Sequence, residues 1–470
     1  MGSLENHDYP VQAGTNGHSQ HAVSNGKGKA SAGKRAWGFD TLQVHAGLED
    51  RPPYGECTVP VYNTASFKFS SRAAADEAFA ISTKHIYSRI HNPTTDALEQ
   101  RITALEGGVD AASFSCGASA VLAVIMALAK AGDNVIVSTH THGGTFHQFN
   151  VVLPEIGIEP RFVNANNTAK VHSLIDARTK LIFTESLGNP SLSVPDLEPL
   201  AAIAHSPNTP GGQIPLVVDA TFTAAGYFFQ PARWGADIII HSATKWIGGH
   251  GTTLGGLVIE TGRSDWQSNS ARFPHLHGRR AGRETVDDNL YEQVGNAAFI
   301  RHLKWEVLRD TGACMSPLAA QQLFIGVETL SLRCARQAAN AAAVAEYLRG
   351  HPRVKWVRYL GFEDHPYHAL ARKYFEPGRG FGTVVTFGLH GGAAEGLKVV
   401  DAFELVINTS NVGDAKTIIG HHWSTTHKQC TKEENEEMGV YEDLFRLSLG
   451  IEDVEDIIAD FEQAFQKVVV

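Results

Sequence analysis

Apolar residues follow two alternating patterns through the middle of the chain. Leu98, Ile102 and Leu105 have the spacing of one helix face, whereas short runs such as 134–138 are β-branched and have the length of buried strands. This alternation predicts strands and helices in turn over 95–107, 111–114, 118–131, 134–138, 145–153, 159–163, 171–177, 181–184, 197–204, 216–219 and 238–241. Strands separated by such helices predict an α/β fold with a mostly parallel sheet.

The pattern changes near residue 309. The elements predicted beyond it are an alanine-rich helix over 337–349, strands over 354–358 and 383–389, and a closing helix over 454–468. We therefore divide the folded chain into a large domain over 98–308 and a smaller C-terminal α/β domain over 309–470 with an antiparallel element. The polar and weakly periodic stretch 264–288 predicts a long surface loop.

The first part of the chain has a different composition. Residues 1–36 are rich in Gly, Ser, Asn and His and contain almost no large apolar side chains. They cannot bury enough surface to offset the entropy of ordering, which predicts a disordered tail. The segment 37–97 is irregular and rich in Pro and Tyr, so we expect an N-terminal arm outside the α/β core.

Composition narrows the function classes. A formal net charge of −10 argues against a general nucleic-acid binder, and the chain has no apolar run of the roughly 18 to 20 residues that a membrane span needs. The five cysteines are widely spaced and form no C-x-x-C pair, a pattern typical of free thiols in a reducing compartment. Since the N-terminus has no signal-peptide or transit-peptide pattern, we expect a cytoplasmic protein.

Several common functional motifs are absent from the sequence. There is no G-x-x-x-x-G-K-[ST] and no G-x-S-x-G, and the glycines of 248–255 follow a lysine instead of opening a helix after a strand. His140, His142 and His147 lie close together but have no partnering carboxylate pattern, so no metal site is predicted.

Four polar features instead lie at the ends of predicted parallel strands, where an open α/β sheet places its ligand crevice. The small residues of 115–118 join a strand to a helix, so their backbone N–H groups can approach a phosphate; an ordinary tight turn is the alternative. Asp219 follows four apolar residues. A carboxylate buried there needs a partner such as a pyridinium nitrogen, unless it simply caps the turn at Thr221.

The other two features contain Lys245 and Asn189. Ser242 and Thr244 can donate hydroxyl hydrogen bonds to a phosphate while Lys245 condenses with an aldehyde, because an enclosed cationic site lowers the pKa of its amine. A surface lysine is the alternative, although it would not need these small, glycine-rich surroundings. Asn189, next to Pro190, either hydrogen-bonds a ligand or belongs to a plain turn.

Together these segments resemble the Cys/Met-metabolism family of pyridoxal 5′-phosphate (PLP) enzymes, and within it the O-acetylhomoserine sulfhydrylases. The resemblance covers 39–468, nearly the whole folded part. The motifs that carry it are V-P-V-Y at 59–62, Y-S-R-x-x-N-P-T at 87–94, S-C-G at 115–117, G-G-T-F at 143–146, E-S-L-G-N-P at 185–190, D-A-T-F at 219–222, the segment around Lys245, E-T-L-S-L-R at 328–333, S-T-T-H at 424–427 and R-L-S-L-G-I-E at 446–452. The stretches 295–299 and 309–313 are similar to the sulfhydrylase branch rather than to the lyases.

The resemblance implies an α/β fold of the aspartate-aminotransferase type, assembled as a homotetramer from dimers with shared active sites. The arm over 37–97 would contact the neighbouring subunit, with Tyr87 and Arg89 reaching the phosphate of that subunit's PLP. The large domain would hold the cofactor as a Schiff base with Lys245. The other cofactor-binding residues that the family implies are Ser115, Gly117, Ala118, His142, Glu185, Asn189, Asp219, Thr221, Ser242 and Thr244.

The implied reaction is γ-replacement on an O-acyl-homoserine. Arg446 would bind the substrate α-carboxylate as a bidentate pair, helped by Asn411 and Thr426, and Lys245 would move protons at Cα and Cβ. Acetate would leave from Cγ, and sulfide would replace it to give homocysteine. Replacement by a carbon or nitrogen nucleophile and an elimination of the methionine γ-lyase type stay open as alternatives.

One position departs from the family pattern. The family usually has Tyr before the Gly-Gly-Thr, where the ring stacks on PLP and assists leaving-group chemistry, but here the residue is His142. Imidazole can still stack, whereas its pKa of about 6.5 differs from that of a phenol at about 10. His142 therefore joins Lys245 as a catalytic residue, and its effect on leaving group and nucleophile stays open.

Overall fold

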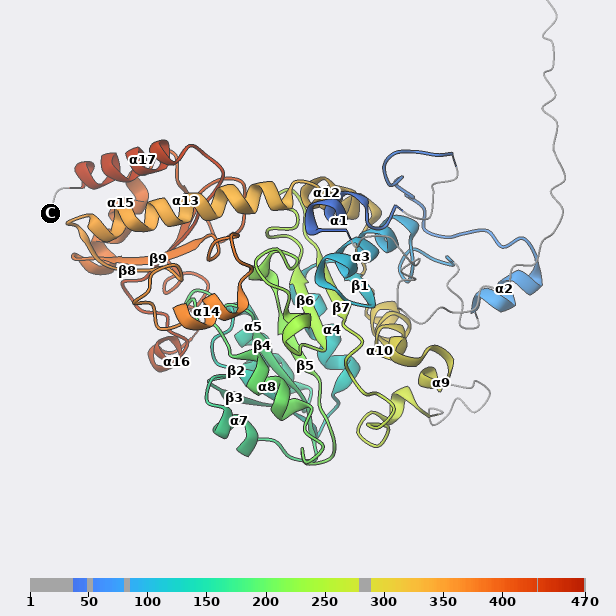
Figure 1. Ribbon diagram of the computed structural model, residues 1–470. Helices are drawn as coiled ribbons and strands as arrows, with labels where there is room; N and C mark the ends of the chain where they lie inside the picture. The colour runs from blue at the N-terminus through green and yellow to red at the C-terminus, as the bar shows by residue number, and fades with distance from the viewer. Residues whose placement is uncertain (1–36, 49–53, 80–84, 279–288, 429, 469–470) are drawn as a thin grey trace, which may run out of the picture. The chain divides into compact units, whose positions relative to one another are not determined.

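The computed structural model describes residues 37–48, 54–79, 85–278, 289–428 and 430–468, and the predicted tail over 1–36 lies outside them. The described strands form two sheets, which lie in different parts of the ribbon (Figure 1). The strands are β1 (Asp110–Phe114), β2 (Asn134–Ser138), β3 (Glu159–Val163), β4 (Thr179–Glu185), β5 (Leu216–Asp219), β6 (Ile238–Ser242), β7 (Gly256–Glu260), β8 (Val354–Arg358), β9 (Val384–Leu389), β10 (Ile407–Asn408), β11 (Ile418–Gly420) and β12 (Phe445–Ser448).

The larger sheet has seven strands in the order β1-β7-β6-β5-β4-β2-β3. Strands β2 to β6 run parallel to their neighbours among themselves, and β7 is antiparallel to both β1 and β6. The predicted mostly parallel α/β fold is therefore confirmed. The sequence did not reveal β7, because glycines precede its short apolar run. Gly256 is required there, since a Cβ would collide with the carbonyl oxygen of Cys116.

The helices cover the sheets and connect their strands (Figure 1). They are α1 (Phe39–His45), α2 (Arg72–Phe79), α3 (Pro93–Glu106), α4 (Gly117–Leu128), α5 (Gly143–His147), α6 (Leu153–Glu155), α7 (Thr168–Ser173), α8 (Leu197–Ala204), α9 (Leu290–Val294), α10 (Ala298–His302), α11 (Arg309–Thr311), α12 (Pro317–Val327), α13 (Leu330–Gly350), α14 (His368–Tyr374), α15 (Gly392–Ala402), α16 (Lys432–Glu437) and α17 (Val454–Lys467). Two π-helical turns, Gln148–Val152 and Leu303–Leu308, extend α5 and α10.

The ends of α3 follow directly from its sequence. Asn92 caps the N-terminus by accepting a hydrogen bond from the Thr94 N–H at 2.9 Å, and Pro93 occupies the first helical position, where no N–H is needed. Gly107 ends the helix in the left-handed conformation, with φ of 73°. These signals fix both ends of α3, and the apolar face of the helix is buried beside β1.

The smaller sheet has five strands in the order β10-β11-β12-β9-β8. β12 lies at its centre and pairs antiparallel with β11 and β9, which places Arg446 opposite Gly420 and Thr386. Helices α13, α15 and α17 pack on this sheet through a separate apolar cluster. α13 begins at residue 330, seven residues before the predicted start at 337, because polar residues in its first turns interrupt the apolar pattern. The predicted domain boundaries at 97/98 and 308/309 stay predictions.

The described part of 264–288 is an irregular, partly exposed segment, as expected, but it does not lie wholly on the surface. Trp266 and Phe273 are 1% exposed and Leu276 is fully buried, and Trp266 stacks on Phe299 with ring centroids 5.7 Å apart. A few large apolar side chains thus decide the burial of a segment that is polar on average. Residues 279–288 lie outside the described part of the chain.

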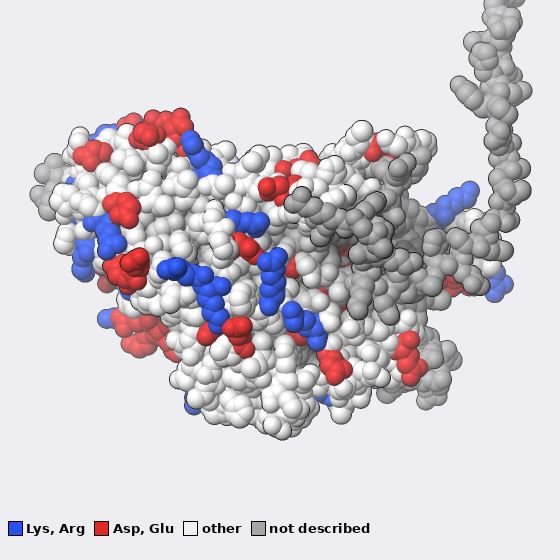
Figure 2. Space-filling model, in the orientation of Figure 1, with Lys and Arg blue, Asp and Glu red and all other residues white. Residues whose placement is uncertain are grey.

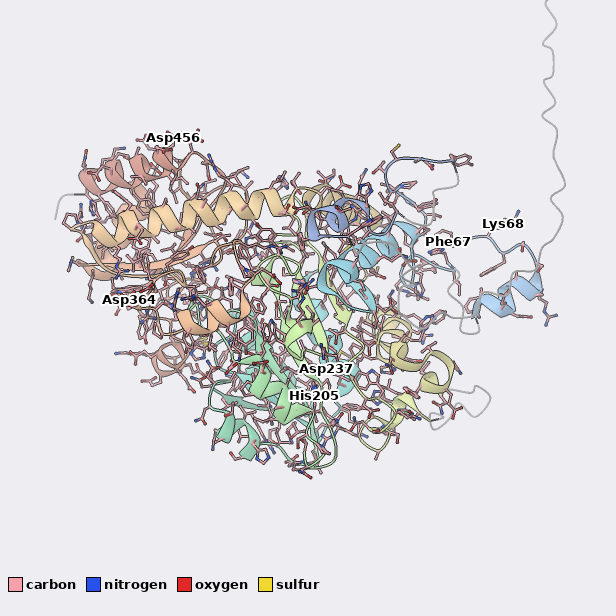
Figure 3. All side chains as sticks on the ribbon, in the orientation of Figure 1. Phe67, Lys68, His205, Asp237, Asp364 and Asp456 are labelled. Atoms are coloured by element: carbon pink, nitrogen blue, oxygen red, sulfur yellow. The ribbon has the colours of Figure 1, made fainter. Side chains whose placement is uncertain are left out.

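Side-chain contacts fix individual elements to the larger sheet. His205, at the C-terminal end of α8, points toward Asp237 (Figure 3), and its Nε2 lies 2.6 Å from Asp237 Oδ2. The same carboxylate accepts a hydrogen bond from the Leu216 N–H, so one buried side chain connects α8 with β5 and β6. On the face that Figure 2 shows, acidic and basic side chains are interspersed. Among the described residues, no helix combines the length and apolar character that crossing a bilayer requires.

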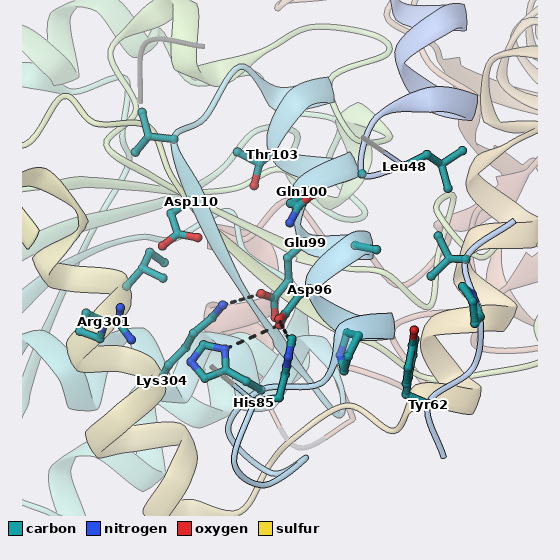
Figure 4. Close-up of a pocket in the computed structure, with 18 residues that line it drawn as sticks. Leu48, Tyr62, His85, Asp96, Glu99, Gln100, Thr103, Asp110, Arg301 and Lys304 are labelled. Atoms are coloured by element: carbon teal, nitrogen blue, oxygen red, sulfur yellow. Dashed lines mark hydrogen bonds and ion pairs between the residues drawn. The ribbon is translucent and has the colours of Figure 1, made fainter. Parts of the chain in front are cut away.

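A cavity of about 650 Å³ lies between the arm, α3 and α10 and contains an ion network (Figure 4). Lys304 forms a short bond to Glu99, which also accepts hydrogen bonds from the N–H and hydroxyl of Ser113 at 2.8 and 2.7 Å. Burial alone would lower the pKa of Lys304, but the surrounding carboxylates raise it. None of the predicted site residues lines this cavity, so we assign the ion network a structural role.

Replacing Lys304 with methionine is expected to lower the free energy of unfolding by about 3–5 kcal/mol, because the buried Glu99 carboxylate loses its partner. Denaturant unfolding at one fixed protein concentration measures this change. Lys432→Met is the matched control: Lys432 pairs with Glu436 on an exposed helix face, so the change should stay below about 0.5 kcal/mol. Equal effects of the two substitutions would contradict the structural role of the network.

Candidate active site

Asp219 and Ser242, at the ends of β5 and β6, are connected through Thr221. Thr221 donates two hydrogen bonds to Asp219 Oδ1, from its hydroxyl at 2.6 Å and from its N–H at 3.0 Å. The Ser242 N–H donates to the Thr221 hydroxyl oxygen at 2.8 Å. Burial raises the pKa of Asp219 in spite of these donors. A positive partner is therefore needed to keep this carboxylate ionised.

The predicted phosphate turn lies against the end of β6. Gly117, the first residue of α4, packs so tightly that a Cβ there would lie 2.7 Å from Ser242 Cβ. Ala118 follows in the same helical turn, and the hydroxyl of Ser115 lies 3.3 Å from that of Ser119. A helix N-terminus beside serine hydroxyls is an arrangement that favours an anion such as phosphate.

Lys245 follows β6 and reaches toward the smaller sheet. Its Nζ donates to Asn411 Oδ1 at 2.8 Å. Burial and then the charge of Arg446 lower the pKa of Lys245 to about 8, which brings the neutral, nucleophilic amine within reach of ordinary pH. A pocket of about 530 Å³ opens here, lined in part by Thr244, Lys245, Ser410 and Asn411.

Arg446, on β12, joins the two sheets at this point. Its Nη1 donates to Asn189 Oδ1 at 2.8 Å, and its Nη2 donates to the Asn411 carbonyl oxygen at 2.7 Å. Its Nε is buried and has no partner in the part of the chain that the structure describes. Burial lowers the pKa of Arg446 to about 9. This buried guanidinium therefore has a strong electrostatic demand for an anion.

His142 and Glu185 form the next part of the site. Glu185 ends β4 directly beside Asp219 on β5, and its Oε1 accepts a hydrogen bond from the His142 N–H at 2.6 Å. Burial and the neighbouring Asp219 raise the pKa of Glu185. The His142 ring lies close enough to Lys245 and Arg446 to be influenced by both charges. The sequence-predicted His142 is thus inside the site.

Of the remaining predicted residues, one borders the site and two are not joined to it. Thr426 borders the His142 segment, since its carbonyl oxygen is 2.6 Å from where a Gly143 Cβ would lie. Tyr87 and Arg89 are exposed, and the Arg89 guanidinium carbon lies 5.3 Å from the Tyr87 ring centroid. Among the described residues, no hydrogen bond or ion pair joins either of them to Lys245, Asp219 or Ser242.

Sequence reasoning missed two histidines beside the site. His422 and His427 are buried, with ring centroids 6.0 Å apart, and the Nε2 atoms of both have no hydrogen-bond partner among the described residues. Both lie near Arg446, whose charge lowers their pKa values after burial does. His427 belongs to the S-T-T-H motif, which was its only sequence signal; His422 had none.

These residues fit PLP group by group. Lys245 supplies an amine of lowered pKa for the aldehyde, and Asp219 supplies a buried carboxylate that matches a protonated ring nitrogen. The tight Gly117–Ser242 contact provides a turn suited to a phosphate. Arg446 then lies where an amino-acid carboxylate would find a fork of N–H donors.

Comparison with known proteins finds relatives over nearly the whole chain. Residues 40–466 match the family model described as Cys/Met metabolism PLP-dependent enzyme. Sulfhydrylase FUB7 of Fusarium oxysporum f. sp. lycopersici is 47% identical over 437 residues, which cover 91% of this chain and 97% of that protein. Homocysteine synthase of Schizosaccharomyces pombe is 44% identical, with 91% and 98% covered.

A solved structure is also similar to this chain. It is that of a protein described as O-acetylhomoserine (thiol)-lyase from Campylobacter jejuni subsp. jejuni, and it contains N′-pyridoxyl-lysine-5′-monophosphate. The TM-score is 0.85 and the identity 31%, and the match covers 92% of this chain and 100% of that one. The fold predicted from the sequence is therefore shared with a solved structure that carries a pyridoxyl-lysine.

Proposed function

Because this chain belongs to the Cys/Met metabolism PLP-dependent enzyme family, we propose that it replaces the acyloxy group of an O-acyl-homoserine at Cγ. The proposed reaction is O-acetylhomoserine plus sulfide giving homocysteine plus acetate. The observation that carries it is the position of Lys245 and Arg446, which bind the side-chain and main-chain oxygens of one residue, Asn411. A proton-transferring amine and a carboxylate-binding guanidinium are thereby held beside the same residue.

We assign the cofactor-binding residues as follows. Lys245 bonds the PLP aldehyde, and the other contacts come from Tyr87 and Arg89 of a neighbouring subunit and from Ser115, Gly117, Ala118, His142, Glu185, Asn189, Asp219, Thr221, Ser242 and Thr244. When bound, PLP withdraws electrons from the carbon atoms of the attached amino acid. Arg446, Asn411 and Thr426 orient the substrate carboxylate. Lys245 would accept a proton from Cα, give that proton up, and then as a neutral amine accept a second proton from Cβ, which prepares Cγ to lose its acyloxy group.

A second candidate function uses the same residues with a different nucleophile. A carbon or nitrogen nucleophile in place of sulfide would build a non-standard amino acid. The observation that favours it is His142, which occupies the position where the family usually has tyrosine. The incoming nucleophile would therefore react beside an imidazole instead of a phenol.

We further propose a homotetramer, a dimer of dimers with shared sites. The exposed Tyr87 and Arg89 support this assembly, because a phosphate-binding pair without a phosphate partner in its own chain fits a site in a neighbouring one. Leu318 and Ile325 are 54% and 57% exposed and lie seven residues apart on α12, and Leu332 near the start of α13 is 71% exposed; such exposed apolar side chains are typical of an interface. We place the enzyme in the cytoplasm, where its five free thiols would stay reduced.

The test is a product screen with the PLP-loaded protein. O-acetylhomoserine is incubated with sulfide, and mass spectrometry is expected to show homocysteine and acetate in equal amounts. Parallel reactions contain methanethiol, amines or β-keto acids, and unacylated homoserine with sulfide is the control in which no product should form. Consumption of another nucleophile while sulfide is left would favour the second candidate. No loss of the ester with any nucleophile would overturn the proposal.

A further inference from the structure

We infer that His142 acts as a neutral hydrogen-bond donor and thereby restricts the enzyme to leaving groups that depart as stable anions. The inference rests on the proposed γ-replacement and concerns its first half, the departure of the group from Cγ. An acyloxy group leaves as the conjugate base of an acid with a pKa of about 4, whereas a thioether leaves as the conjugate base of a thiol with a pKa of about 8.5. The thiolate needs a proton as it leaves, and the carboxylate does not.

Local geometry sets the hydrogen position on the ring. His142 caps the N-terminus of α5, and its Nδ1 accepts a hydrogen bond from the Gly144 N–H at 3.2 Å. A ring nitrogen that accepts a hydrogen bond carries no hydrogen, so the neutral ring has its hydrogen on Nε2. Gly144 permits this arrangement, since a Cβ there would lie only 2.9 Å from the His142 Cε1. The backbone of the Gly-Gly turn therefore selects one tautomer.

The surroundings keep the ring uncharged. The groups that face it are Lys245 after β6, Arg446 on β12, and His422 and His427 in the segment after β11, whereas Glu185 binds the backbone N–H rather than the ring. Burial, followed by His427, Arg446 and Lys245, lowers the pKa of His142 to about 3. Burial and Arg446 lower the pKa of His427 to about 4. No proton is thus stored on His142 at the pH values at which enzymes of this kind work.

The chemistry of the two leaving groups then diverges. In the ester, the Cγ–O bond breaks, both electrons go to oxygen, and the carboxylate departs while Nε2–H donates a hydrogen bond to it. Hydrosulfide supplies the electron pair for the new Cγ–S bond, so ester plus HS⁻ gives thiol plus carboxylate with no further proton. In a thioether, the Cγ–S bond would release a thiolate next to a neutral imidazole, which is too weak an acid to protonate it.

Three substitutions of His142 distinguish a hydrogen-bond donor from a general acid. His142→Gln keeps a neutral N–H donor, and we expect kcat/KM for O-acetylhomoserine with sulfide to stay within about tenfold of the wild-type value. His142→Phe removes the donor and should lower it about 10- to 100-fold, the effect of one hydrogen bond to a charged group. His142→Tyr supplies an ionisable phenol, and cleavage of methionine to a 2-oxo acid should rise at least about tenfold over the wild-type rate.

Two outcomes would overturn the inference. One is a loss of about 10²- to 10⁴-fold in His142→Gln, which is the effect of removing a general acid. The other is wild-type cleavage of methionine at a rate comparable with that for the ester.

A measurement that needs no substrate tests whether the His142 ring becomes protonated. The Cε1 hydrogen of histidine exchanges for deuterium at a rate that follows the protonation of the ring, and peptide mass spectrometry measures it for single histidines. Between pH 5 and 9 the rate for His142 should show no inflection, and the exposed His172 serves as the reference. An inflection near the ordinary imidazole pKa of about 6.5 would refute the inference. Because this measurement needs no turnover, it separates failure of the inference from failure of the proposed function.

Discussion

Replacing Lys245 with alanine is expected to lower kcat by at least about 10³-fold and to remove the visible absorbance of bound PLP. The amine is proposed both to bond the cofactor and to move the protons at Cα and Cβ, so one substitution removes two functions. Because the pKa of Lys245 is lowered to about 8, more of its amine is neutral, which is the form that both functions need. Initial rates with O-acetylhomoserine and sulfide, together with absorbance spectra, measure the two losses.

Borohydride treatment adds a direct assignment. In the wild-type protein it should fix the cofactor mass on the peptide that contains Lys245, and the alanine variant should show no such peptide. Lys355→Ala is the control, because Lys355 is an exposed lysine whose partner is Asp443, and its kcat should stay within about twofold. Full turnover by Lys245→Ala would disprove the assignment.

Replacing Asp219 with asparagine is expected to lower kcat by about 10²- to 10³-fold, because a neutral amide no longer keeps the cofactor ring nitrogen protonated. The same change should not destabilise the cofactor-free protein. Burial raises the folded-state pKa of Asp219 above its value in the unfolded chain, so ionisation of this carboxyl opposes folding. That penalty grows as the pH rises above the unfolded-state pKa of about 3.9, and it is complete above the folded-state pKa.

Denaturation midpoints of the cofactor-free proteins measure the predicted effect of Asp219→Asn on stability. Relative to the wild type, Asp219→Asn should be more stable at pH 8 than at pH 5. Asp364→Asn is the control, since Asp364 (labelled in Figure 3) is exposed and pairs with Arg349, and both kcat and midpoint should hardly change. A destabilised Asp219→Asn protein at pH 8, or one with normal kcat, would count against the assigned role.

The site was predictable from the sequence wherever it lies at the end of a parallel strand. Asp219 and Lys245 follow runs of apolar residues, and the carboxyl ends of such strands meet at one edge of a sheet. Arg446 was found only through the resemblance. It meets Asn189 across 257 residues of chain, and no local pattern encodes a contact between two sheets. The phosphate that we propose for Tyr87 and Arg89 is beyond any single-chain argument, because the proposal places it in a neighbouring subunit.

Some helices and strands were likewise predictable from the sequence, and others were not. β3, β5, β8 and α8 begin and end at the predicted residues, and each has a polar residue or a proline on at least one side. β7 was missed, since a central strand framed by glycines gives no periodic signal. The burial of Trp266 was missed because averaging over a polar stretch conceals single aromatic residues.

The position of β1 has a consequence for synthesis of the chain. Among the described strands, β1 lies at the edge of its sheet and pairs with β7, so this strand partner is complete only when residue 260 has been made, 146 residues after β1 ends. At about 5–20 residues per second, a ribosome needs roughly 7–30 s to cover that distance. During that interval the unpaired backbone of an almost fully buried, apolar strand is open to other nascent chains. α3, made just before β1, is the element already available to shield it.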